Sequence, residues 1–145
     1  MNDKIEIYTH IYQDSEMCIS SIEELKKDLK DKDNKIKGTL DEIIKGFIKY
    51  KKESKKILNK MNSAPEKEGM FAKMMANMGI KKEVSSDNSD SHIAEVMIQG
   101  ISMGSINMEK KIDNYEDKLD HGDLKYAKKF LDYEKDCIEK LKEYL

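Results

Sequence analysis

The 145-residue sequence is poor in proline, aromatic residues and cysteine, and it has no long hydrophobic run. It contains one proline, three phenylalanines and no tryptophan, and its two cysteines are Cys18 and Cys137. Without a run of about 18 apolar residues we expect no transmembrane segment. The polar start of the chain also lacks the apolar stretch of a signal peptide. These absences favour a cytoplasmic protein in which both cysteines serve as small buried apolar side chains.

Charge and motifs exclude several further classes. Charged residues make up 39% of the chain, yet the net charge is −2 and both signs are mixed along the sequence. We therefore expect no nucleic-acid partner, since such proteins normally carry a basic face. The sequence lacks Cys-x-x-Cys, a glycine-rich phosphate loop, Gly-x-Ser-x-Gly and any Glu-x-x-His pair. No catalytic residues can be assigned, and the sequence gives no indication of an enzyme.

What the chain does contain is four stretches with apolar residues alternately three and four positions apart. This spacing is typical of helices that bury one stripe against other helices. We predict a single all-α domain over residues 1–145, built as a four-helix bundle. The predicted helices span residues 4–31, 34–61, 91–119 and 123–145.

Helix starts are predicted from residues that can accept a hydrogen bond from a free backbone N–H. For the second helix the candidates are Asp33 and Thr39, and the phase of the apolar residues favours Asp33. The third helix is expected to begin after Ser89, Asp90 and Ser91. In the turn before the fourth helix, Gly122 is the expected left-handed residue and Asp123 the expected cap. Gly100 and Gly104, four residues apart, leave room for close approach by a neighbouring segment.

The connection between the second and third helices is about 30 residues long, whereas simple bundles use about 2–8. A connection of this length allows a crossover after which the two helices run in the same direction, as in ferritin-like folds. Its first part predicts a short Met-rich helix over residues 66–79, ending at Gly79.

Four polar residues are candidate ligands for a divalent metal ion: Glu134, His92, Glu95 and His10. Glu134 occupies an apolar position of its helix, and a crossover bundle would let it accept hydrogen bonds from Tyr50, Ser15 or Ser54. His92 and Glu95 are one turn apart, and His10 is a possible third ligand. The alternative interpretations are structural: Glu134 fixes helix register or reaches the surface, and His92 helps to cap the third helix.

The ten methionines suggest a different role, because flexible thioether side chains suit surfaces that bind protein partners. Methionines also fill the cores of proteins, and their thioether groups can bind the soft ion Cu(I). The start of the third helix is apolar on two sides, which indicates cover by the Met-rich segment or by a second subunit. A small-ligand pocket beside that segment is a third possibility. The candidate interaction residues are Phe71, Met74, Met75, Met78, Met97 and Met103.

Two blocks of the sequence resemble a group of small, mostly uncharacterised ferritin-like bundle proteins of low-GC Gram-positive bacteria. They are the Met-rich block 69–80 and the block 91–100, and the likeness extends to the start of the chain around residues 8–12. The resemblance implies a ferritin-like four-helix bundle and no established activity.

We therefore expect a non-catalytic structural or interaction protein that self-associates and needs no cofactor. The alternative is a ferritin-like metal-binding or redox protein with a degenerate site in the bundle core.

Overall fold

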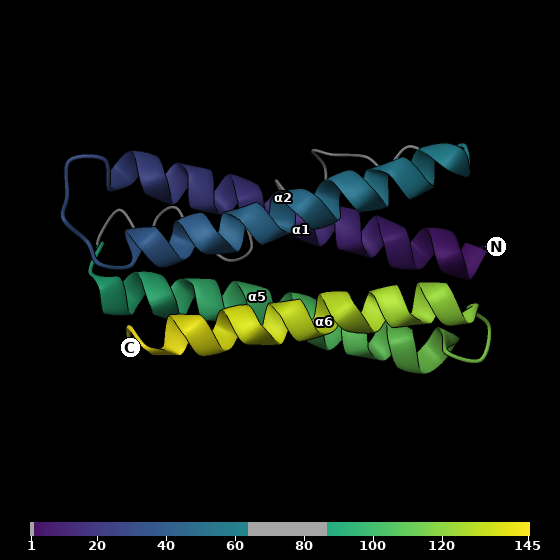
Figure 1. The fold of residues 1–145 in the computed structure, drawn as a ribbon. Coiled ribbons are helices and arrows are strands. Elements are labelled where there is room, and N and C mark those ends of the chain that lie inside the picture. Colours follow the sequence, from purple (N-terminus) through teal and green to yellow (C-terminus); the bar gives the residue numbers. More distant parts are fainter. Residues whose placement is uncertain (1, 64–86) are drawn as a thin grey trace.

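The computed structural model describes residues 2–63 and 87–145, and these residues form four packed helices with no strand (Figure 1). The helices are α1 (Asn2–Asp28), α2 (Lys37–Lys60), α5 (Asp90–Tyr115) and α6 (His121–Lys142). The predicted all-helical bundle is confirmed, with helix ends that differ from the predicted ones by one to four residues. The predicted short helix at 66–79 lies outside the described residues. No helix within the described ranges is long and apolar enough to cross a membrane.

The bundle consists of two antiparallel helical hairpins. α1 packs most extensively on α2, and α5 on α6, while the hairpins meet through α1–α5, α1–α6 and α2–α6. Figure 1 shows that α2 and α5 begin at the same end and run in the same direction. At that end the Asn34 side-chain amide donates to the backbone oxygen of Asn88 (2.9 Å) and to Asp90 Oδ1 (2.8 Å). The end of α2 and the start of α5 therefore lie at opposite ends of the bundle.

A cluster of aromatic rings fills the space between α2 and α6 and extends to α1. Neighbouring ring centroids lie 5.0–6.1 Å apart, mostly in edge-to-face or tilted pairs. Such pairs add about 0.5–1.5 kcal/mol each beyond the burial of their area. The members are Tyr8, Phe47, Tyr50, Tyr126, Phe130 and Tyr133. The cluster anchors α6 to α2 and fixes their register.

The predicted starts of α2 are both wrong. Ile36 occupies the cap position, and no side chain accepts a hydrogen bond there. Contacts between distant residues hold this loop instead, because the backbone N–H of Lys35 donates to Asp90 Oδ2 (3.1 Å) beside the Asn34 contacts. Thr39 shares a hydrogen bond with the Tyr144 hydroxyl (2.6 Å). Asp33 is exposed.

The predicted cap of α5 is confirmed, whereas the predicted cap of α6 is wrong. Ser89 caps α5 as predicted, its hydroxyl accepting from the His92 N–H (3.3 Å). Asp120, rather than Asp123, caps α6, since Asp120 Oδ1 accepts from the Asp123 N–H (2.8 Å). Gly122 does not adopt the left-handed conformation, which in the described residues occurs at Asn62 (φ 56°), just past α2.

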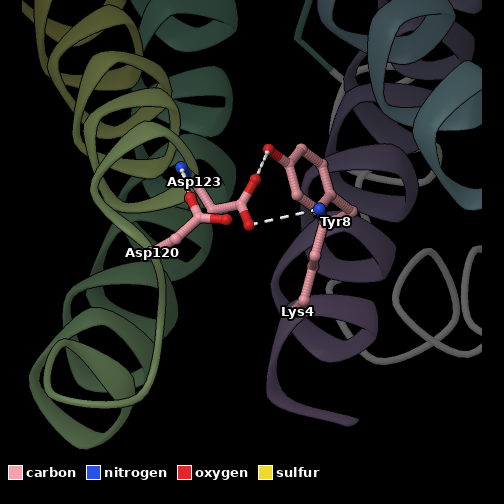
Figure 2. Close-up of polar contacts among 4 residues, drawn as sticks. All are labelled: Lys4, Tyr8, Asp120 and Asp123. Carbon is pink, nitrogen blue, oxygen red and sulfur yellow. Dashed lines mark hydrogen bonds and ion pairs between the residues drawn. The ribbon is translucent and has the colours of Figure 1, made fainter. Parts of the chain in front are cut away.

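The Asp123 side chain points to α1 instead (Figure 2). Its Oδ1 accepts a 2.6 Å hydrogen bond from the Tyr8 hydroxyl, and its Oδ2 lies 3.3 Å from Lys4 Nζ. A buried carboxylate is stable in this place because it accepts a hydrogen bond from a hydroxyl group and forms an ion pair with an ammonium group. The contact joins the first two turns of α1 to the first turn of α6.

Candidate functional site

Glu134 lies in the bundle core with 0% of its surface exposed. The predicted hydroxyl donors do not reach it. Ser54 Oγ donates to the Tyr50 backbone oxygen (2.7 Å), Tyr50 Oη lies 3.5 Å from the Lys129 backbone oxygen, and neither Ser15 Oγ nor either Glu134 oxygen has a hydrogen bond. That part of the sequence prediction is wrong. The Ser54 hydroxyl bonds to the backbone of its own helix, and the Tyr50 hydroxyl faces the backbone of α6.

The neighbour of Glu134 is Asp14, a residue of α1 that the sequence analysis missed. Asp14 is 6% exposed, and its carboxyl lies within hydrogen-bonding reach of the Glu134 carboxyl. Burial, and then the negative charge of Asp14, raises the pKa of Glu134 well above its usual range. The core thus holds two carboxyl groups side by side, each from a different hairpin.

α5 makes room for Asp14. A Cβ atom at Gly104 would overlap both Asp14 carboxylate oxygens, so the Asp14 side chain occupies the space that a larger residue would fill. His10 borders the same place: its Nε2 lies 3.3 Å from the Gly104 backbone oxygen and 3.8 Å from Asp14 Oδ2. Three helices therefore shape the pair, with α1 and α6 supplying the carboxyl groups and α5 the recess.

Cys18 and Cys137 flank the pair, one turn beyond Asp14 on α1 and one turn beyond Glu134 on α6. Both thiols are buried and free. Burial raises the pKa of Cys137 to about 11. Burial, followed by the nearby charges of Asp14 and Glu134, raises the pKa of Cys18 well above its usual range. Thiols held in the neutral form are poor nucleophiles, as expected for apolar packing residues.

The four predicted metal ligands do not come together. His10 lies beside Gly104, whereas His92 and Glu95 are nearer the start of α5, about 18 and 14 Å away along the helix axis. Glu95 is exposed, and the His92 backbone takes part in the helix cap. Within residues 2–63 and 87–145, no group of three or more His, Cys, Asp or Glu side chains is arranged to hold a metal ion.

Of the predicted interaction residues, two lie in the described part of the chain. Met103 is exposed on α5 (47%), while Met97 is buried (3%). Met97 borders a hollow of about 10 Å³ between α1 and α5, which has room for about one water molecule. The remaining candidates, Phe71, Met74, Met75 and Met78, lie outside the described residues.

Comparison with models of known protein families, with curated proteins and with solved structures found nothing that matches this chain.

Proposed function

We propose that the protein is a non-catalytic helical bundle that acts by binding other protein chains, in the first place a second copy of itself. The observation that carries this proposal is the outer face of α5. Met103 and Ile106, one turn apart, are 47% and 52% exposed. They are two of the three large apolar side chains exposed in the described residues, the third being the C-terminal Leu145.

The residues around this pair strengthen the case. Gln99 and Asn107 are exposed one turn before and after Met103, so this strip of α5 carries no charge. Most exposed positions elsewhere in the four helices are lysine, glutamate or aspartate. Loss of charge and gain of methionine distinguish the centres of protein interfaces from ordinary surface. We call residues 99, 103, 106 and 107 the α5 strip.

Light scattering coupled to size-exclusion chromatography, over a range of micromolar concentrations, tests the proposal. We expect a dimer that Met103→Glu converts to a monomer, because the new carboxylate would lose its water in the interface. Asn114→Glu is the matched control, since it adds the same charge to α5 at an exposed position outside the strip. A monomeric wild-type protein, or equal dissociation in both variants, would contradict the proposal.

The proposal includes a ferritin-like fold and a cytoplasmic location. The common direction of α2 and α5 supports the first, since a long crossover between parallel helices is typical of ferritin-like bundles. The resemblance to small ferritin-like proteins of Gram-positive bacteria belongs to the same proposal. The alternative metal-binding or redox function has less support, because His92 and Glu95 lie far along α5 from His10.

A further inference from the structure

The Asp14–Glu134 pair, which the interaction function does not use, lacks most of the hydrogen bonds that buried carboxyl groups normally receive. Three of its four oxygens, Asp14 Oδ2 and both Glu134 Oε atoms, receive no hydrogen bond. His10 Nε2 is 3.8 Å from Asp14 Oδ2, beyond hydrogen-bonding distance, and lies closer to the Gly104 carbonyl. Buried carboxylates are otherwise paired or hydrogen-bonded, so this pair requires an explanation.

Two ionised carboxylates cannot remain in contact in such a place. Each loses its hydration on burial, and their mutual repulsion is not screened by solvent. A single proton removes both penalties. It neutralises one group and creates a charge-assisted O–H···O⁻ hydrogen bond, which is among the strong hydrogen bonds of proteins. Carboxyl pairs that share a proton are the usual result when two acids meet in one site.

We propose that Asp14 and Glu134 bind one proton between them at neutral pH, and that this proton joins the two helical hairpins through α1 and α6. Glu134 is the protonated member and donates to Asp14. The assignment follows from burial, since Glu134 is completely enclosed whereas Asp14 adjoins His10. Loss of the proton would place two negative charges across the interface between the hairpins.

The groups around the pair agree with this assignment. From α1 the titratable neighbours are His10 and Cys18, and from α6 the Cys137 thiol. From α2, the Tyr50 phenol lies near Cys137, and its pKa is raised by burial and then by the charges of Glu53 and Asp132. α5 contributes Gly104, with its carbonyl beside His10. Neither the thiols nor the phenol can carry a positive charge, so none of them neutralises the pair.

A divalent metal ion is the other way to neutralise the pair. The described residues favour the proton, because they offer no third His, Cys, Asp or Glu placed to complete a metal site. Two carboxylates alone make a weak site for a metal ion, whereas they are sufficient for a shared proton.

The sign of the pH effect follows from the direction of the Glu134 pKa. Glu134 has an ordinary value of 4.5 in the unfolded chain and a raised value in the folded protein. Folding therefore takes up a proton between these two values. Stability from this site is complete below pH 4.5 and is lost as the pH rises toward the folded value. In that window the folding equilibrium constant falls by about ten-fold per pH unit.

Urea unfolding between pH 5 and 9 tests the proposal on wild type, Glu134→Gln and the exposed control Glu143→Gln. The glutamine amide can still donate to Asp14 but cannot titrate, so Glu134→Gln should remove the downward slope. Its stability relative to wild type should then increase as the pH rises. Glu143→Gln should keep the wild-type slope. Asp14→Asn, which leaves Glu134 without its charged neighbour, should shift the slope to lower pH.

Infrared spectroscopy gives a readout that does not depend on stability. At pH 7 the wild type should show the C=O stretch of a protonated carboxyl group, absent in Glu134→Gln and present in Glu143→Gln. A wild type without this band, or with the same pH slope as Glu134→Gln, would overturn the proposal. So would a stoichiometric divalent metal in protein purified without chelator, if Glu134→Gln abolished its binding.

Discussion

The close approach of α2 and α6 at Gly46 gives the most direct test of the packing. A Cβ atom there would overlap the Tyr133 phenol, whose hydroxyl donates a 2.7 Å hydrogen bond to the Ile43 backbone oxygen. In Gly46→Ala the Tyr133 ring must move. We expect this to cost about 1–3 kcal/mol for the lost hydrogen bond and about 1–3 kcal/mol for disturbed packing against Phe47 and Tyr50.

Alanine also favours the helix over glycine by about 1 kcal/mol, which offsets part of that cost. The net prediction for Gly46→Ala is a loss of about 3 kcal/mol, or a Tm lower by about 6–12 °C. Gly38→Ala is the matched control on the same helix. A Cβ there meets nothing within 4 Å, so the control should be more stable than wild type by up to about 1 kcal/mol.

A double-mutant cycle separates the Tyr133 clash from other causes. With Tyr133→Leu in the background the phenol is absent, so Gly46→Ala should lose most of its penalty. Thermal unfolding followed by circular dichroism measures all four proteins. If Gly46→Ala were as stable as Gly38→Ala, or if its cost persisted in the leucine background, the described contact between α2 and α6 would be refuted.

Three further substitutions test individual contacts by the same unfolding assay. Tyr8→Phe should cost about 1–3 kcal/mol, because buried Asp123 loses its hydroxyl donor and keeps only the partly exposed Lys4; an unchanged Tm would contradict the bond. Ser89→Ala should cost about 0.5–2 kcal/mol through loss of the α5 cap, whereas exposed Ser91→Ala should not. Asn34→Ala should cost about 1–3 kcal/mol, since it removes two hydrogen bonds between the α1–α2 loop and the start of α5; equal stability would show that these bonds contribute nothing.

Periodicity predicted the helices because burial of one stripe depends on local spacing alone. The ends were less predictable, since tertiary contacts decide them. Asp33 has the chemistry of a cap, yet Asn34 and Asp90 fix that loop across the bundle. Asp123 has the same chemistry, but it turns to Tyr8 on another helix. From a single sequence, hydrogen-bond donors and acceptors can be compared only among residues that are close along the chain. The sequence does not show which residues of distant segments compete for the same groups.

The candidate site was half visible in the sequence. Glu134 interrupts an apolar stripe, and this signal located it in the core. Asp14 precedes Ser15, the expected stripe position, and so looks like a solvated acid. Gly104 was the one indication of a group such as Asp14 in the core, because a small residue at that position allows close approach by another segment. The approaching group proved to be a side chain from α1. Spacing along one helix does not reveal which side chain of another helix fills such a space.

The hairpin arrangement has a consequence for the order of assembly. Each hairpin of α1 with α2, and of α5 with α6, joins segments that are close in sequence, so each can form by local search before the two dock. Hydrogen exchange in the native state should then reveal an opening in which the hairpins separate while their helices persist. The acids that meet between α1 and α6 would be reached by water in that state, and alkaline solution would lengthen its lifetime.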